Sequence, residues 1–368
     1  MSSIPNLNTL RTGRRGPRLR GARGGRAIPE NDEGTSESLE AGRDKIIQQT
    51  DNDASSSRLS AVALGYLDDP FARSFLHTGE QIPRRYPIIN RGTYVRTTAI
   101  DRLVQKFLEI RPQQKKQVVS LGAGSDTRFF RLAVKHANEA GQIAYHEVDF
   151  ESNVHQKRAF IRQSAEIEQT IRAAEKAGLT YHLHALDLRD LTNKSPPAIP
   201  GLEPETPTLL LSECCLCYLP PEMATSVLQY FTMNLKGPLG LVLYEPIRPF
   251  DAFGKTMVSN LASRGIHLQT LKRYYSLEAQ RQRLRLAGLQ DGQGARDVSQ
   301  LYADDDWISQ AETERVEKLE WLDEVEEWNL LAGHYCVAWG WRGEAFSVAW
   351  QGIEGGRTKE EDRDDEMV

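Results

Sequence analysis

Two glycines, a serine and an acid follow a short apolar run in the first half of the chain, in the order Gly122-Ala123-Gly124-Ser125-Asp126. The run QVVSL at 117–121 has the composition of a buried strand, and a helical pattern follows it. Because glycine has no Cβ, this turn lets the backbone pass close to a ligand. Asp149 comes 25 residues after Gly124, at the end of the next expected strand, where a carboxylate can accept both hydroxyl groups of a ribose. These residues predict a binding turn for a cofactor that contains adenosine.

The residue three positions after Gly124 distinguishes two kinds of adenosine cofactor. A dinucleotide site of the GxGxxG type has glycine or alanine there, and this chain has Thr127, which would crowd the packing of helix on strand. Ser125 and Asp126 would also face a pyrophosphate with a negative charge at the helix start. S-adenosylmethionine has no phosphate and carries a sulfonium cation. The loop therefore favours S-adenosylmethionine over a dinucleotide.

Further acids follow two later strands. Asp187-Leu188 comes after the expected strand at 179–185, and Glu213 ends the strand at 208–213. Because the carboxyl ends of parallel strands meet at one edge of a sheet, we expect an acidic rim suited to a cationic ligand. Asp187 is equally explained as a helix N-cap, and the alternative for Glu213 is a salt bridge. Cys214, Cys215 and Cys217 lack a nearby histidine, so we expect no metal site.

The alternation of short apolar runs with longer amphipathic ones predicts an α/β fold, with a mostly parallel seven-stranded sheet flanked by helices. The last run, HYCVAWGWR, is suited to a final strand pair. We expect one helix from Glu151 to about Lys176 and another near 321–331. Two segments read as surface insertions, SPPAIPGLEPETP and GLQDGQGARD. The expected strands are 117–121, 143–148, 179–185, 208–213 and 240–245, and further helices are expected at 126–138 and from 220–221 to about 235.

Composition divides the chain into three parts. Residues 1–55 are rich in Arg and Gly and poor in apolar side chains, which predicts a disordered tail. A domain should follow at 56–350, with a helical lid at 56–110, whose connector is PRRYPIINRGTYVR, and an α/β core at 111–350. The segment 351–368 reads as an acidic disordered tail.

Charge and cysteine content restrict the function class. The net charge is −5 although residues 1–29 hold seven arginines, so the body is acidic and a dedicated nucleic-acid binder is disfavoured. No run of 18 apolar residues or secretory signal is readable, and we expect no membrane association. Four cysteines, three of them crowded together, do not suggest disulfides. We expect a cytoplasmic protein, with a nuclear location also open.

Seven segments in order resemble the leucine carboxyl methyltransferases, over roughly residues 56–342. They are INRGTYVR, SLGAGSDTRFFRL, YHEVDF, LDLRD, LLLSECCLCYLPPE, YEPIRPFDAFGKTM and HYCVAWGW. The resemblance implies the Rossmann-like methyltransferase fold and S-adenosylmethionine as cofactor. It also implies a substrate and partner, namely the α-carboxylate of the C-terminal leucine of the catalytic subunit of type 2A protein phosphatases.

The resemblance also implies roles for particular residues. Arg96 would hold the methionine carboxylate, and Glu213 its amino group. Asp149 would bind the ribose, and Asp187 and Leu188 would flank the adenine, with Gly122 and Gly124 beneath the cofactor. The family has a lysine in the early helix, and the matching place here holds Arg58, which keeps the charge and changes the shape.

A leucine α-carboxylate is ionised near neutral pH, so the transfer needs no general base. The enzyme must hold a carboxylate oxygen in line with the methyl group and remove water from it. Arg96 and Tyr218 are the candidates for orienting the carboxylate, and a packed tyrosine is the alternative for Tyr218.

Two other functions remain open. A relative that methylates a modified guanosine in transfer RNA carries a long repeat-rich extension, which we do not see after the last expected strand, and the body of this chain is acidic. A non-catalytic adaptor that binds the phosphatase would not need the glycine loop together with Asp149 and Glu213. We therefore expect the protein-carboxylate enzyme.

Overall fold

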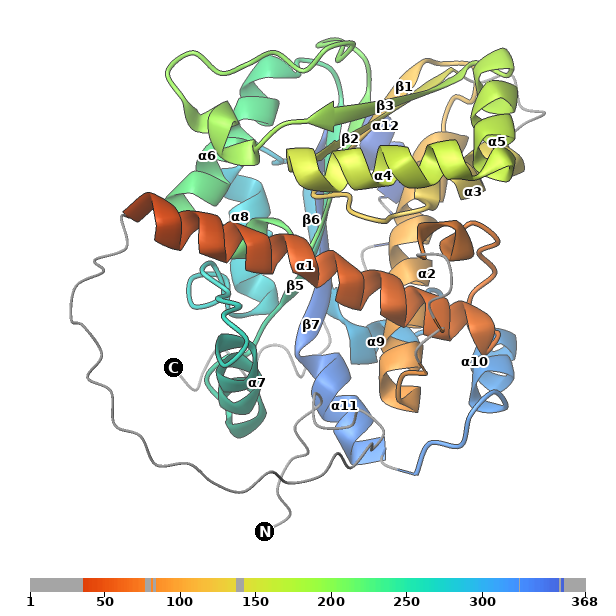
Figure 1. Cartoon of the computed structure of the whole chain (residues 1–368), viewed down its shortest axis with the longest axis vertical. Coiled ribbons are helices and arrows are strands. Elements are labelled where there is room, and N and C mark those ends of the chain that lie inside the picture. The colour runs from red at the N-terminus through yellow and green to blue at the C-terminus, as the bar shows by residue number, and fades with distance from the viewer. Residues whose placement is uncertain are drawn as a thin grey trace, which may run out of the picture.

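One seven-stranded sheet organises the computed structural model, which describes residues 36–76, 81, 84–136, 142–323, 325–350 and 352–353 (Figure 1). The strand order is β3-β2-β1-β4-β5-β7-β6. The first five strands of this order run parallel, whereas β7 pairs antiparallel with both β5 and β6. The strands are β1 Lys116–Leu121, β2 Ile143–Asp149, β3 Leu179–Ala185, β4 Thr208–Glu213, β5 Leu239–Pro246, β6 Gly292–Asp297 and β7 Tyr335–Arg342.

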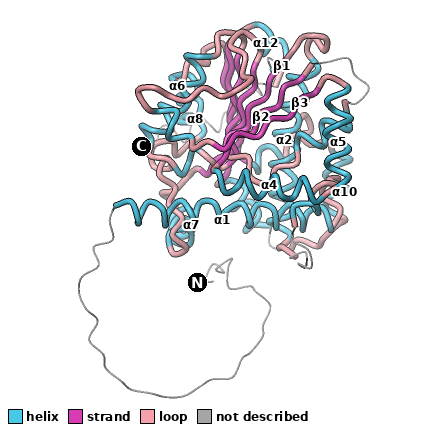
Figure 2. Tube along the Cα trace, turned by 45° about the horizontal axis from the view of Figure 1, so that its top comes forward, coloured by secondary structure: helices cyan, strands magenta, loops and turns pink. Residues whose placement is uncertain are grey.

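Helices cover both faces of the sheet (Figures 1 and 2). Alternation along β4 shows why: Leu209 and Leu211 belong to one apolar core, and Leu210 belongs to the other. The first core includes residues of α2, α3 and α12, and the second includes residues of α6 and α8. The helices are α1 Ser36–Ala63, α2 Pro87–Glu109, α3 Arg128–Lys135, α4 Glu151–Gln163, α5 Ala165–Lys176, α6 Pro221–Asn234, α7 Ala252–Ala262, α8 Leu277–Leu286, α9 Val298–Tyr302, α10 Gln310–Glu317, α11 Val325–Gly333 and α12 Glu344–Trp350, with the short 3-10 helices η1 Ala72–Phe75, η2 Leu188–Thr192 and η3 Leu216–Tyr218.

The predicted strands are confirmed for β1 to β5, but β6 was missed. Its sequence, GQGARD, lies in the segment that was predicted to be a surface insertion, and that prediction is wrong. A Cβ on Gly292 or Gly294 would overlap the rings of Trp341 or Trp339. The two glycines therefore let the tryptophans of β7 lie over β6, and HYCVAWGWR forms the single strand β7 rather than a strand pair.

Three helix predictions also need correction. The helix expected from Glu151 to Lys176 is two helices, because Ser164 interrupts it and caps α5 by accepting a hydrogen bond from the Ile167 amide. The helix expected from 321 begins at Val325. The segment PIINRGTYVR, predicted as part of a connector, lies in α2, which starts with Pro87 at its first position.

The largest difference from the prediction is α1. Residues 36–55 were assigned to a disordered tail, and the structure places them in a 28-residue helix. This helix runs across one end of the sheet (Figure 2). Ion pairs with the body hold this polar helix, including Asp44 with Arg189 and Asp53 with Arg264. Such tertiary contacts stabilise a helix that its own sequence would not stabilise in isolation.

The rest of the predicted N-terminal tail, and nearly all of the predicted C-terminal tail, lie outside the described residues. Across the described helices, we find none with the length and apolar composition needed to cross a membrane.

Candidate active site

A cavity of about 560 Å³ lies at the carboxyl ends of the central strands, with α1 and α2 along its walls. The structure brings all the predicted site residues to this one cavity, although the chain supplies them from positions spread over residues 58–218. They are Arg58, Arg96, Gly122, Gly124, Asp149, Asp187, Leu188, Glu213 and Tyr218. The sheet edge is where ligands bind in open α/β folds, so the location agrees with the topology.

The glycine loop forms the floor beside β1. Gly122 and Gly124 have φ values of 63° and 47°, in the left-handed region that favours glycine. A Cβ on Gly122 would lie 2.6 Å from Sγ of Cys215, and one on Gly124 would overlap the carboxylate of Asp51. Both positions therefore require glycine for conformation and for space.

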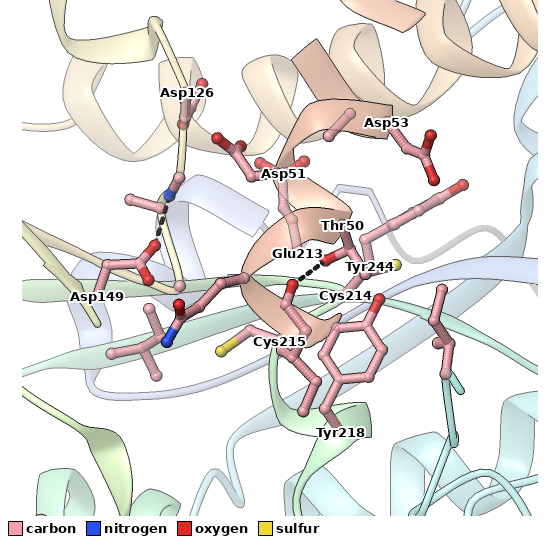
Figure 3. Close-up of a pocket in the computed structure, with 18 of the residues that line it drawn as sticks. Thr50, Asp51, Asp53, Asp126, Asp149, Glu213, Cys214, Cys215, Tyr218 and Tyr244 are labelled. Atoms are coloured by element: carbon pink, nitrogen blue, oxygen red, sulfur yellow. Dashed lines mark hydrogen bonds between the residues drawn. The ribbon is translucent and has the colours of Figure 1, made fainter. Parts of the chain in front are cut away.

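Asp149 fixes the loop from the end of β2. The Gly124 amide donates a hydrogen bond of 2.7 Å to Oδ2 of Asp149, drawn as a dashed line in Figure 3. Oδ1 accepts from the Phe150 amide at 2.7 Å and from Asn153 at 2.9 Å. Burial raises the pKa of Asp149, and these three donors oppose that effect. The carboxylate is thus held rigidly at the place predicted to bind a ribose.

Asp51 of α1 covers the other side of the loop, and sequence reasoning missed it. Its Oδ1 accepts hydrogen bonds from both the amide and the hydroxyl of Ser125, each at 2.8 Å. Figure 3 shows Asp51 on α1, beside the loop that carries Asp126. The local sequence offered one sign that this segment packs on the body, the apolar pair Ile46 and Ile47. Ile46 packs against Gly265, and Ile47 lines the cavity.

Asp187 joins α1 to the adenine side of the predicted site. It caps η2 by accepting the Arg189 amide at 2.9 Å, so the N-cap interpretation is observed. The Arg189 guanidinium bridges Asp187 and Asp44 of α1, at 2.6 Å to Asp44. The neighbouring Leu188 is buried and gives the cavity an apolar wall.

Glu213 is held between two arginines. Nε of Arg96 donates to its Oε2 at 2.8 Å, and Nη2 of Arg128 lies 2.8 Å from Oε1. Burial favours a raised pKa, but the charges of Arg128 and Arg96 hold the pKa of Glu213 below its ordinary value. The salt bridge considered for Glu213 is therefore present, and the carboxylate is ionised.

Arg128 was not predicted as a site residue. It is 1% exposed and also pairs with Asp126 at 2.6 Å and Asp101 at 2.7 Å. It lies behind Glu213 at the start of α3, and no local pattern distinguishes it from any other arginine in a first helical turn. Arg96 instead lines the cavity, with its guanidinium carbon 4.4 Å from the centre of the Tyr244 ring.

The two remaining predicted residues have partners within the chain. Arg58 pairs with Asp69 at 3.1 Å and lies 3.9 Å from Asp126 of the loop, so two acids of the chain share its charge. Tyr218 ends η3 and lines the cavity, and its backbone carbonyl accepts a hydrogen bond from the Gln269 side chain. Burial raises the pKa of Tyr218 well above its usual range, so its hydroxyl keeps its proton.

Comparison with known proteins identifies a family of methyltransferases, in agreement with the cofactor predicted for this site. The leucine carboxyl methyltransferase family model matches residues 46–232. Leucine carboxyl methyltransferase 1 of Aspergillus fumigatus is 52% identical, over 96% of this chain and 98% of that protein. The chain belongs to the leucine carboxyl methyltransferase family. Emericella nidulans has a relative of the same name at 49% identity, covering 97% and 99% of the two chains, and the Arabidopsis thaliana homologue is 33% identical over 80% and 88%.

Family membership makes the chain an S-adenosylmethionine-dependent methyltransferase, and the methyltransferase fold predicted from the sequence is confirmed. The cavity fits this cofactor. Gly122 and Gly124 leave room that any Cβ would fill, Asp149 and Leu188 suit an adenosine, and Arg96 with Glu213 suits the charged ends of a methionine. Within the described part of the chain, no three His, Cys, Asp or Glu side chains are grouped to hold a metal ion.

Proposed function

We propose that this protein methylates the α-carboxylate of the C-terminal leucine of the catalytic subunit of a type 2A protein phosphatase, giving a leucine methyl ester. The observation that carries the proposal is the near full-length similarity, at 52% identity, to a protein named leucine carboxyl methyltransferase 1. The described cavity supports it through its size, its acidic floor and the position of Arg96.

The side chains of the cavity suit a nucleophile that is already ionised. Of the described residues that line it, none is a histidine, and its acids are engaged in hydrogen bonds with the loop or with arginines. A terminal carboxylate needs no deprotonation near neutral pH, so a site without a general base is sufficient. Bound S-adenosylmethionine supplies the electrophilic methyl group.

The chain's own residues then orient the carboxylate and exclude water. The Tyr218 hydroxyl, kept protonated by burial, can donate a hydrogen bond to a carboxylate oxygen, and Arg96 offers a charged donor nearby. Tyr244 stacks on Tyr335 with ring centres 5.6 Å apart, forming an apolar wall beside Arg96. Positioning and desolvation of this kind lower the barrier without proton transfer.

Transfer of a radiolabelled methyl group tests the proposal. The protein is incubated with labelled S-adenosylmethionine and the phosphatase catalytic subunit, either intact or without its terminal leucine. We expect base-labile label on the intact subunit alone. Label on transfer RNA instead would favour the RNA-modifying relative. Cofactor binding without transfer to either substrate would favour a non-catalytic adaptor.

A further inference from the structure

Two neighbouring strands present Glu213 and Tyr244 together at the wall of the cavity (Figure 3). Glu213 ends β4, and its register partner on β5 is Tyr244. Side chains of register partners on adjacent strands lie on the same face of a sheet. Tyr244 belongs to the first apolar core, which includes residues of α2, so this face is the one that α2 covers. The sheet therefore offers α2 an acid and an aromatic ring at adjacent positions.

Arg96 of α2 contacts both of these side chains. Its Nε donates to Oε2 of Glu213 at 2.8 Å, and its guanidinium carbon lies 4.4 Å from the centre of the Tyr244 ring. A hydrogen bond through Nε alone would leave the planar guanidinium free to turn about that contact. The aromatic ring against the guanidinium removes this freedom, because the cation is attracted to the ring face.

The bond to Glu213 leaves the far end of the Arg96 guanidinium available. Among the described residues, Arg96 donates its hydrogen bond through Nε, and its two Nη nitrogens have no hydrogen-bonding partner. The side chain lines the cavity and is 26% exposed, against 16% for that of Glu213. Two donors in one plane match the two oxygens of a carboxylate. A carboxylate in the cavity can thus accept two hydrogen bonds from Arg96, provided that the plane of the guanidinium is held.

Tyr335, at the start of β7, supports the ring of Tyr244. The two ring centres are 5.6 Å apart and the ring planes are within 13° of parallel. Both tyrosines line the cavity, and Tyr244 is 8% exposed. Neither hydroxyl group forms a hydrogen bond with a described residue, so the contribution of this pair to the site comes from the rings.

We propose that Tyr244 is a positioning residue for the methyl donor. Its ring, stacked on Tyr335, keeps the Arg96 guanidinium in the plane in which both Nη nitrogens donate to the methionine carboxylate of S-adenosylmethionine. A guanidinium that is already ordered loses less conformational freedom when the cofactor binds. The inference rests on the assignment of Arg96 to that carboxylate, and not on the phosphatase as substrate.

Calorimetry of the full-length protein with two ligands tests the proposal. S-adenosylhomocysteine carries the carboxylate, whereas decarboxylated S-adenosylhomocysteine keeps the adenosine, the sulfur and the amino group and lacks only the carboxylate. Tyr244→Leu should bind S-adenosylhomocysteine about tenfold more weakly than the wild type, and the decarboxylated ligand within about twofold of the wild type. Tyr244→Phe keeps the ring and should bind both ligands as the wild type does. The matched control is Tyr275→Leu, which should change neither affinity, since Tyr275 pairs with Phe250 and does not line the cavity.

A double-mutant cycle shows whether Tyr244 acts through Arg96. Arg96→Gln should weaken S-adenosylhomocysteine binding by about a hundredfold, because it removes the charged fork. Adding Tyr244→Leu to Arg96→Gln should then weaken binding by less than about twofold more, since the ring no longer has a guanidinium to hold.

Three results would overturn the proposal: wild-type affinity of Tyr244→Leu for S-adenosylhomocysteine, equal weakening of both ligands, or full additivity in the cycle. If Tyr244→Leu does not fold, Tyr335→Leu takes its place and should show the same pattern, with a loss of about threefold for S-adenosylhomocysteine alone. Wild-type affinity in Arg96→Gln would refute the assignment of Arg96 itself. The measurements use no methyl-accepting substrate, so they stand apart from the question of whether the phosphatase is the partner.

Discussion

Nε of Arg96 and Oε2 of Glu213 are 2.8 Å apart at the carboxyl end of β4. The pair presents a cation and an anion side by side on the wall of a cavity. This matches the carboxylate and ammonium groups of an α-amino acid, which carry opposite charges on adjacent positions. We expect this pair, which comes from two distant segments of the chain, to bind the methionine end of the cofactor.

Glu213→Gln should weaken S-adenosylhomocysteine binding by about a hundredfold, measured by calorimetry, because an amide lacks the charge that attracts an ammonium. It also leaves the buried Arg128 with one carboxylate fewer, and losing one partner of a buried ion pair costs about 3–5 kcal/mol. Urea unfolding should show that loss. The matched control is Glu222→Gln, since Glu222 pairs with Arg273 on the surface with its side chain 81% exposed. If Glu213→Gln binds S-adenosylhomocysteine with wild-type affinity, Glu213 does not bind the cofactor.

Gly122→Ala should reduce both stability and cofactor affinity. The new Cβ would lie 2.6 Å from Sγ of Cys215, and the φ of 63° is unfavourable for alanine. We expect a loss of about 1–3 kcal/mol in the free energy of unfolding, measured in urea. Gly42→Ala is the control, because Gly42 lies in α1 with open space around it, and alanine there should be neutral or stabilising. Equal effects of the two substitutions would refute the steric argument.

Asp51→Ala should expose the glycine loop. The Ser125 amide loses a hydrogen bond to a carboxylate, and such bonds contribute about 1.5–3 kcal/mol. Hydrogen exchange at this amide should therefore accelerate by about tenfold or more, measured by mass spectrometry or NMR. Asp68→Ala, at an exposed acid just beyond α1, should leave the exchange rate unchanged. An unchanged rate in Asp51→Ala would mean that α1 does not protect the loop.

His146→Gln should make the protein less sensitive to acid. Burial lowers the pKa of His146 from 6.5 to about 3, and His182 and His184 add to this effect. The unfolded chain takes up a proton below pH 6.5 that the folded protein does not, so stability is lost as the pH falls from 6.5 towards 3. Between pH 6.5 and about 5, the wild type should lose about 1.5 kcal/mol more than the variant.

Urea unfolding at both pH values measures this difference. His155→Gln, at a histidine whose side chain is 63% exposed, should lose as much stability as the wild type. Parallel pH profiles for the wild type and His146→Gln would contradict the assignment of a neutral buried His146.

The strands could be predicted where both faces are buried. The run TLLLSE of β4 is almost wholly apolar because Leu210 serves one core and its neighbours Leu209 and Leu211 serve the other. By contrast, GQGARD of β6 carries almost no strand signal. Its glycines are required by tryptophans of β7 more than 40 residues later in the chain, and a local pattern does not contain that information.

The site was predictable where the acid or glycine stands at the end of a strand. Asp149 and Glu213 were placed correctly at the cavity because parallel strands gather their carboxyl ends. Asp51 and Arg128 were missed because their positions depend on tertiary contacts. Asp51 lies on a helix held by ion pairs with the body. Arg128 pairs with the neighbouring Asp126 and with acids from two distant parts of the chain, Asp101 and Glu213.

The central claim is that the methyl group goes to a terminal carboxylate. Tandem mass spectrometry of the phosphatase catalytic subunit, after incubation with this protein and S-adenosylmethionine, tests it most directly. We expect one added methyl group on the α-carboxylate of the C-terminal leucine, absent when Glu213→Gln replaces the wild type. A methyl group on any side chain, or an unmodified C-terminus in the presence of bound cofactor, would contradict the account.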